Sequence, residues 1–325
     1  MIFTIFRLNI DSIYFDSNIL NGRLLIHINS CFFVTVSNVI LDNNILTTSS
    51  DELIEITGIG TSLTMSNISI TNTDLLSSPA IHWEGNFGQI AMTQISGHNL
   101  KTDTDGSIVK IGLATILQAS LFTFSNITSH DSDSSNNYMV LISAMDLTAS
   151  FPSVLSNIIV SNSSTGILKI EAAIGDLNPD NMLIVQNLVM SDCNVTNSFD
   201  VISLSSMFTY DPYVIMFSNL TFQNLEFLQG ANLLNLEHLL IIPVRIVNSV
   251  FENVKGGKIS AKSFTTEIQG VSTSIDVSNV TVQNVNALYD SFFTLQTGAI
   301  LTISDSFFSN MSCYEEGTVL YAGNE

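Results

Sequence analysis

The sequence predicts an all-β fold, a parallel β-helix of ten to eleven coils of about 29 residues with three short strands per coil. A short phrase centred on Asn recurs eleven times along the chain, and apolar residues alternate on both sides of it. A third apolar run follows each phrase after about fifteen residues. Self-similarity at such a period is typical of solenoids, so one domain is expected over residues 1–325.

Each phrase holds two corner positions that are five residues apart. The first predicted series is Asp11, Asn38, Asn67, Gln94, Asn126, Asn157, Asn187, Asn219, Asn248, Asn279 and Asp305. The second predicted series is Asp16, Asn43, Asn72, Asn99, Asp131, Asn162, Asp192, Asn224, Asn253, Asn284 and Asn310. Asn tolerates the left-handed backbone conformation of a tight corner, and its amide both donates and accepts hydrogen bonds. We therefore expect a structural asparagine ladder along the stack, with its amides directed toward the interior.

The alternation of apolar residues also predicts the core. Residues two positions before the first corner, such as Val36 and Met65, are expected to face inward, as is the third run, for example Leu53–Ile56. A leucine-rich repeat has a similar period, but its strand places two residues between the last Leu and the Asn. Only one residue separates Ile70 from Asn72, and no ten-residue segment has helical periodicity.

The composition excludes several classes of partner. The chain carries 29 acidic and 9 basic residues, a formal net charge of −20, so nucleic acid is not expected to bind. Its apolar stretches are far shorter than the ~18–20 residues of a membrane-spanning helix, so no transmembrane segment is predicted. Cys31, Cys193 and Cys313 fall in distant coils, which predicts no disulfide between them. No signal peptide is visible, and the lack of terminal capping segments predicts a fragment of a longer solenoid.

Few residues have the spacing of a functional site. Thr102–Gly106 and Asp131–Asp133 resemble the start of a calcium loop but lack its remaining ligands. Trp83 is expected in the core, with a sugar-stacking role as the alternative. His27, His98, His130 and His238 lack metal-like spacing. The sequence thus predicts no catalytic residue, no cofactor and no metal.

Seven Asn-x-Ser/Thr sequences follow from the repeat itself. An inward ladder amide is a poor glycan acceptor, so Asn194 is the best candidate among them. The full set is Asn67, Asn126, Asn162, Asn194, Asn219, Asn279 and Asn310.

The repeat resembles that of the pectin-lyase-like right-handed parallel β-helix superfamily. Within it, Phe124-Ser-Asn126-Ile, Phe217-Ser-Asn219-Leu, Phe251-Glu-Asn253-Val and Phe308-Ser-Asn310-Met are similar to the Phe/Asn repeats of polymorphic outer-membrane proteins. They are also similar to β-helix surface proteins of ciliates and other protists. The resemblance implies a surface or secreted scaffold, often adhesive, that belongs to a larger and membrane-associated protein.

The same superfamily also implies an enzymatic alternative, a polysaccharide lyase or glycoside hydrolase. Polygalacturonase-type hydrolases resemble one another in four motifs, of which only Asn72-Thr-Asp74 occurs here, and Asn72 is already assigned to a corner. The Asp-Asp pair and Gly-His-Gly are missing, and Arg245-Ile-Val lacks the Lys. We therefore expect a non-catalytic extracellular or cell-surface scaffold with carbohydrate or protein ligands. Three or more convergent charged residues in an exposed groove would favour the enzyme instead.

Overall fold

The chain is a parallel β-helix. The structure, a computed structural model, describes residues 7–21, 24–29, 31–48, 52–76, 78–102, 107–129, 138–146, 152–171, 173–175, 182–195, 200–205, 207–209, 214–227, 232–239, 243–263, 273–287, 291–296, 299–313 and 319–323. These residues form 26 strands and no helix, and every strand pairing is parallel, as in the pairs β1–β4 and β13–β16. The predicted all-β solenoid is therefore confirmed.

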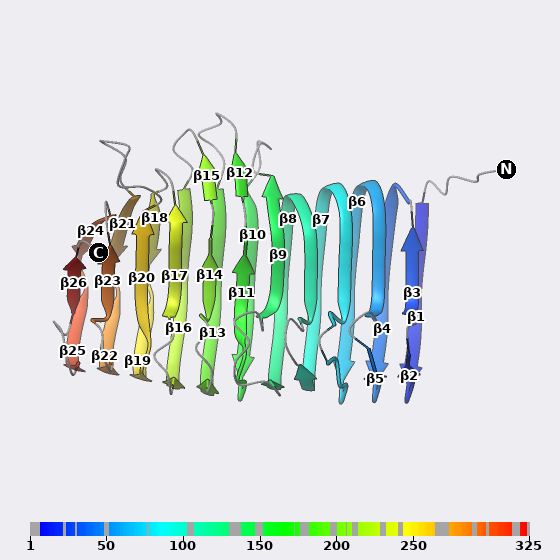
Figure 1. The fold of residues 1–325 in the computed structure, drawn as a ribbon, viewed down its shortest axis with the longest axis horizontal. Coiled ribbons are helices and arrows are strands. Elements are labelled where there is room, and N and C mark those ends of the chain that lie inside the picture. Colours follow the sequence, from blue (N-terminus) through cyan, green and yellow to red (C-terminus); the bar gives the residue numbers. More distant parts are fainter. Residues whose placement is uncertain are drawn as a thin grey trace.

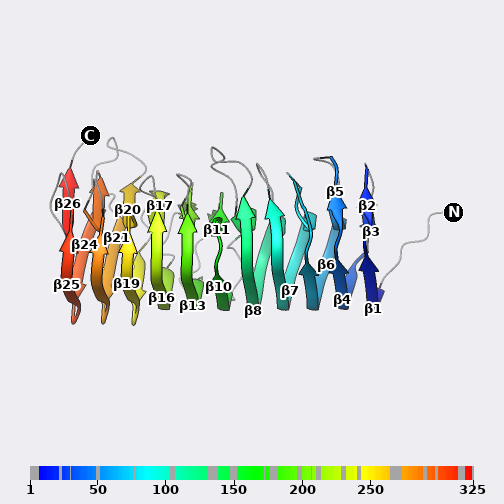
Figure 2. The same cartoon turned by 90° about the horizontal axis from the view of Figure 1, so that it is seen from below.

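Successive coils stack along the long axis of the molecule. Figure 1 shows the strands side by side in chain order, with the N-terminus at one end of the stack and the C-terminus at the other. Figure 2 shows the same order from below. Each residue pairs with its counterpart about one repeat away, for example Val36 with Met65 and Val185 with Phe217.

Three parallel sheets run the length of the stack, and we name them the first, second and third faces. The first face lies before the first corner, and the second face lies between the two corners. Both faces are formed by β1(Arg7–Asp16), β4(Phe33–Asp42), β10(Ser153–Ser161), β13(Met182–Val195), β16(Val214–Phe227) and the last parts of β6(Glu52–Thr71), β7(Ile81–Thr102) and β8(Val109–Ser129). Toward the C-terminus the first face continues in β18(Val244–Val247), β21(Thr273–Ser278) and β24(Ala299–Ser304), and the second in β19(Val250–Lys255), β22(Thr281–Asn286) and β25(Phe307–Ser312).

The third face closes each coil. It contains β3(Leu24–Asn29), the first parts of β6, β7 and β8, and then β9(Tyr138–Asp146), β11(Gly166–Ile170), β14(Ile202–Leu204), β17(Asn232–Leu239), β20(Lys258–Ser263), β23(Phe293–Gln296) and β26(Leu320–Gly323). Two short strands extend this face: β12(Ala173–Gly175) pairs with the end of β9, and β15(Met207–Thr209) pairs with β12. A separate pair follows the second corner and consists of β2(Ile19–Leu20) and β5(Ile45–Leu46).

Alternate residues of each strand fill a continuous apolar interior. Val36, Met65, Val185 and Phe217 are fully buried, as the spacing predicts. Phenylalanines of neighbouring coils meet inside, and the Phe222 and Phe251 rings stack with centroids 5.3 Å apart. Burying each side chain of this size contributes roughly 1.5–3 kcal/mol, so the interior is the main source of stability.

A third bend lies at the start of the third face. Two adjacent residues are buried there in most coils, although an extended strand would place only one of them inside. The chain must therefore turn between them. These pairs are Leu53 and Ile54, Ala80 and Ile81, Ile108 and Val109, Met139 and Val140, Ile167 and Leu168, Val201 and Ile202, Leu233 and Leu234, and Phe292 and Phe293.

The corner residues have positive φ, between 47° and 59°. At the first corner they are Ser12, Asn38, Asn67, Gln94, Leu121, Asn157, Asn187, Asn219, Asn248, Asn279 and Asp305. At the second corner they are Ser17, Asn43, Asn72, Asn99, Asn126, Asn162, Asp192, Asn224, Asn253, Asn284 and Asn310.

The corner amides form files of hydrogen bonds that all run in the same direction. The Nδ2 group of the later coil donates to the Oδ1 atom of the earlier one, at 2.7 Å from Asn67 to Asn38 and at 3.0 Å from Asn253 to Asn224. The expectation that these amides point inward is wrong, because the corner side chains lie on the surface. At a left-handed bend the Cβ atom projects from the outside of the turn, so the amides stack in solvent.

The predicted register is wrong in two coils. In the first coil the corners are Ser12 and Ser17, each one residue after the predicted Asp11 and Asp16. In the fifth coil Asn126 is at the second corner, because its Nδ2 group donates to Asn99 Oδ1 at 2.9 Å and Ser125 pairs with His98.

The first corner of the fifth coil is Leu121, with φ 59°. The apolar residues around the two corners of a coil follow the same pattern. Because the first corner of this coil is Leu and not Asn, the sequence phrase matched the next Asn, five residues later, and the predicted register was displaced by that distance. The matching prediction for Asp131 lies outside the described residues.

The residue after the second corner points inward, and in several coils it is small and polar. The Oγ atoms of Ser163 and Thr73 each donate to the carbonyl two residues earlier, at 2.9 and 2.8 Å, and each accepts a backbone N–H of another coil. Cys193 takes the same position, with its Sγ atom 3.1 Å from Ser191 O, and burial raises its pKa to about 11. All three cysteines are free. These buried groups are paired, so the interior tolerates them.

The corner geometry predicts different effects for two substitutions of Asn253. Asn253→Gly keeps the accessible φ of 54° but loses the amide file, whereas Asn253→Val also places a β-branched residue in a left-handed conformation. We expect Val to lower the free energy of unfolding by about 1–2 kcal/mol more than Gly does. Urea denaturation measures this difference, and equal stability of the two variants would contradict the role of backbone strain.

Leu121, the one apolar residue among these corners, allows the opposite substitution, from an unfavourable residue to Asn. Leu121→Asn places the favoured residue at φ 59° and replaces a side chain that is 48% exposed. We expect a gain of about 0.5–1 kcal/mol in the free energy of unfolding. Leu121→Ala, which keeps the strained backbone and adds no amide, is the control and should bring no comparable gain.

Candidate binding face

The outer side of the first face is uncharged over most of its length. From the second to the eighth coil its two central outward rows contain only Ser, Thr, Gln, Ala, Val, Ile and Met. The rows are Thr35, Thr64, Ala91, Gln118, Val154, Ile184 and Met216, and Ser37, Ser66, Thr93, Ser120, Ser156, Gln186 and Ser218. Arg245 and Asp276 follow in the next two coils.

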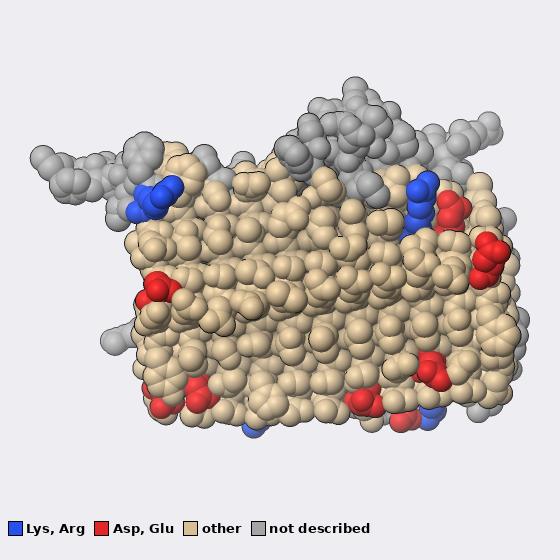
Figure 3. All heavy atoms as spheres, turned by 180° about the vertical axis from the view of Figure 1, so that it is seen from behind, with Lys and Arg blue, Asp and Glu red and all other residues tan. Residues whose placement is uncertain are grey.

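Figure 3 shows this pattern on the side that faces away in Figure 1, where the strands of the first face lie. A broad area carries no charged side chain, and the Lys, Arg, Asp and Glu residues lie at its margins. This area is uncharged although the chain has a formal net charge of −20.

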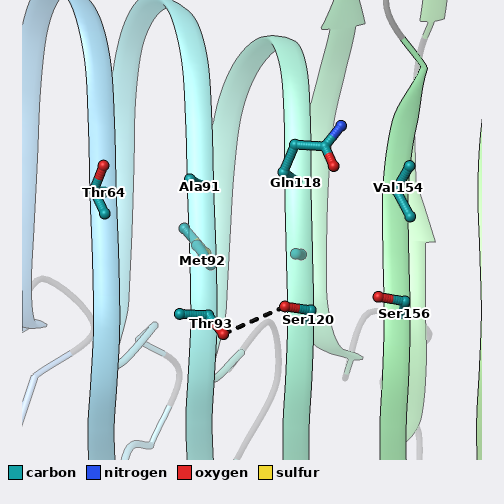
Figure 4. A pocket seen from close by; sticks show the side chains of 9 residues that line it. Thr64, Ala91, Met92, Thr93, Gln118, Ser120, Val154 and Ser156 are labelled. Atoms are coloured by element: carbon teal, nitrogen blue, oxygen red, sulfur yellow. Dashed lines mark hydrogen bonds between the residues drawn. The ribbon is translucent and has the colours of Figure 1, made fainter.

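A shallow hollow of about 280 Å³ lies in the middle of this face. Its lining comes from four successive coils: Thr64, Ala91, Met92, Thr93, Gln118, Ala119, Ser120, Val154 and Ser156. In Figure 4 the Ser120 hydroxyl reaches Thr93, with Ser120 Oγ and Thr93 Oγ1 3.3 Å apart, and Gln118 turns toward β10. The Gln118 Nε2 group donates to the O atom of Pro152, the residue before β10, at 2.7 Å. This hollow offers hydroxyl and amide groups beside small apolar ones and contains no titratable residue.

Titratable side chains do converge on the third face. His27, Glu55 and His82 are register partners in β3, β6 and β7. His27 Nδ1 lies 2.6 Å from Glu55 Oε2, and His82 Nδ1 lies 2.6 Å from Glu52 Oε1. Ligand atoms of Glu52, Glu55 and His82 all lie within 4.8 Å of one another. We call these four residues the His/Glu cluster.

This cluster is not apparent in the sequence, because its residues do not have the short spacings that are typical of metal-ligand motifs. In a solenoid the neighbour of a residue is one coil away, and the steps of 28 residues from His27 to Glu55 and 27 from Glu55 to His82 match the repeat. A search at the repeat length would have found it.

A second polar group on the third face is structural. Burial raises the pKa of Tyr138, and the charge of Asp200 adds to this effect. A Cβ atom on Gly166 would meet the Tyr138 ring at 2.6 Å, so this position requires glycine. Asp200 accepts hydrogen bonds from the Nδ2 groups of Asn232 and Asn235, both at 2.6 Å, which joins neighbouring coils.

On the second face His98 Nδ1 lies 2.7 Å from Ser125 Oγ. Thr71 separates Asp42 from His98 in this row, and Asp42 instead accepts hydrogen bonds from Thr71 at 2.6 Å and Asn72 at 2.9 Å. These two bonds lower the pKa of Asp42. The arrangement does not bring a carboxylate to the His98–Ser125 pair.

Other residues singled out in the sequence have structural positions. Asn72 is a corner with φ 50°, while Asp74 forms isolated bridges with Ile45 and Lys101. Trp83 is fully buried and belongs to the core, and Asn194 is exposed in β13. Residues 103–106 and 131–133, the predicted calcium-loop fragments, lie outside the described residues, as does His130.

Within the part of the chain that the structure describes, no helix has the length and apolar character needed to span a membrane.

The stacked parallel strands place the chain in the class of parallel β-helix proteins. No protein-family model matches the sequence, and no curated protein matches it. Among solved structures, it is similar to the crystal structure of endo-xylogalacturonan hydrolase from Aspergillus tubingensis, with 12% sequence identity and a TM-score of 0.34. The match covers 98% of this chain and 87% of that chain.

The hydrogen bonds to Asp42 predict an acid-dependent loss of stability. The folded state lowers the pKa of this carboxyl below 3.8, so its contribution is present above that pH and is lost as the pH falls through the folded pKa. We expect Asp42→Asn to lose less stability than the wild type between about pH 5 and pH 2. Thr71→Ala removes one donor and should raise the Asp42 pKa toward 3.8, which NMR titration of the carboxyl measures. An unchanged pKa in Thr71→Ala would contradict this assignment.

Proposed function

We propose that the chain is a non-catalytic, extracellular or cell-surface β-helix scaffold whose first face binds a neutral polysaccharide. The observation that carries the proposal is the uncharged outer side of the first face, which spans seven coils of a strongly acidic chain. The sequence resemblance to surface-displayed β-helix repeats supports the location.

The chemistry of the face suits a neutral, hydroxyl-rich ligand. Ser and Thr hydroxyls and the Gln118 amide offer both donors and acceptors, which sugar hydroxyls can match. Ala91 and Val154 supply small apolar patches between them. An anionic polymer would gain no ion pair in the hollow and would meet acidic groups at its margins.

The repeat spacing supports a polymer in preference to a small molecule. Equivalent side chains recur at about 4.8 Å from coil to coil, so the face presents a line of similar weak contacts. Weak contacts in a row add up to a high overall affinity only when the ligand is long enough to engage several of them at once.

A protein ligand or an enzymatic role is an alternative that the same experiment distinguishes. The residues lining the described hollow include no carboxylate, whereas glycoside hydrolysis uses a pair of them on either side of the scissile bond. The His/Glu cluster lies on a different face of the solenoid.

Two variants of one strand test the binding face. Ser120 lies on the first face and Thr123 on the second, three residues apart in β8 across the Leu121 corner. We expect the wild type to bind neutral polysaccharides such as cellulose or xyloglucan, and Ser120→Arg to weaken that binding at least tenfold. Thr123→Arg adds the same charge on the other face and should leave binding unchanged. Affinity electrophoresis and pull-down measure both.

Three outcomes would contradict the proposal. Preferential binding of polygalacturonate would show that the face does not select neutral polymers, and no binding to any polysaccharide tested would favour a protein ligand. Release of new reducing ends during incubation would favour the hydrolase alternative.

A further inference from the structure

We propose that the His/Glu cluster is a binding site for a divalent transition-metal ion of the zinc class. Glu52, Glu55 and His82 would be the protein ligands, and His27 would position the Glu55 carboxylate. The site is independent of the proposed binding face, because it lies on the third face, in β3, β6 and β7.

The fold brings these ligands together without special loops. Parallel pairing places Glu55 beside His82 in neighbouring strands, which lie about 4.8 Å apart. The bend between Leu53 and Ile54, both fully buried, lets Glu52 and Glu55 reach the same outer side although they are three residues apart. The result is three ligand atoms within 4.8 Å of one another, carried by regular strands.

One carboxylate oxygen in the cluster lacks a hydrogen-bond partner. Glu52 Oε1 lies 2.6 Å from His82 Nδ1, but Glu52 Oε2 is buried and has no partner among the residues that the structure describes. A buried acceptor without a partner costs about 1–3 kcal/mol, and more when it is charged. A cation between Glu52, Glu55 and His82 would satisfy this oxygen.

The ligand types favour zinc over calcium. Imidazole nitrogen together with carboxylate oxygen suits Zn²⁺ and similar ions, whereas Ca²⁺ takes six to eight oxygen ligands. Ligand atoms of a tetrahedral zinc site lie roughly 3.4 Å apart. On zinc binding, the 2.6 Å distance between His82 Nδ1 and Glu52 Oε1 must therefore lengthen. The longer distances among the ligand atoms of Glu52, Glu55 and His82, which reach up to 4.8 Å, must shorten. Rotation of the side chains can produce both changes.

The surroundings are compatible with a cation. His27 contacts Glu55 Oε2 at 2.6 Å, as a histidine that orients a ligating carboxylate would. Lys110 pairs with His82 in the next strand, and its positive charge disfavours a bound cation. Glu84 lies two residues after His82 in β7, and its negative charge favours a bound cation. Side chains of Glu52 and His82 are each 14% exposed, so the site is accessible from solvent. Three protein ligands leave one tetrahedral position for water.

Zinc titration of the full, untagged chain tests the site. Isothermal titration calorimetry with ZnCl₂ should show one saturable site per chain, and Zn²⁺ should raise the melting temperature. We expect His82→Gln and Glu55→Gln each to weaken zinc binding at least a hundredfold and His27→Gln to weaken it about tenfold. His98→Gln removes a surface histidine on the second face and should bind as the wild type does.

Circular dichroism of the metal-free variants separates loss of the site from loss of the fold. If one ligand variant does not fold, the other ligand variant and His27→Gln decide the question. Absence of saturable zinc binding by the wild type would overturn the proposal and leave two His–Glu ion pairs. Undiminished binding by a folded His82→Gln, or calcium binding as tight as zinc binding, would overturn it equally.

Discussion

In-register parallel hydrogen bonding between successive coils is the constraint on which the rest of the structure depends. Because each strand pairs with its counterpart one repeat away, each side chain meets the residue in the same position of the next coil. Stacking like on like is then favourable for Asn at the corners, for Phe222 on Phe251 in the core and for hydroxyls on the first face. A row of like charges would repel along the stack, and where charged residues do follow one another they can alternate in sign, as Arg245 and Asp276 do.

The sequence was sufficient to predict the solenoid and its core, because both depend on alternation and period, which are properties of the sequence itself. The sequence was not sufficient to predict the register of a coil that departs from the repeat. Leu121 occupies a backbone conformation that Asn prefers, and no local signal distinguishes it from a strand residue. The sequence also did not predict that the corner amides point toward solvent, because only the path of the whole coil defines which side of a bend is the outside.

Functional features were harder to predict because they depend on contacts between coils. His27, Glu55 and His82 are remote in sequence and adjacent in space, and each has an ordinary local context. The uncharged first face is likewise a property of two outward rows taken together, since each strand contributes only two or three residues to it. In other solenoids, candidate ligands that are separated by one repeat length would reveal such sites.

The direction of the backbone hydrogen bonds has a mechanical consequence. These bonds run along the long axis, from coil to coil, so a pull on the two ends loads them in tension and concentrates force on one interface at a time. A pull across a face loads many bonds in shear together. The molecule is therefore expected to be compliant lengthwise, yielding coil by coil, and stiff against sideways loads. A rod of this kind can absorb extension while most of its coils stay folded.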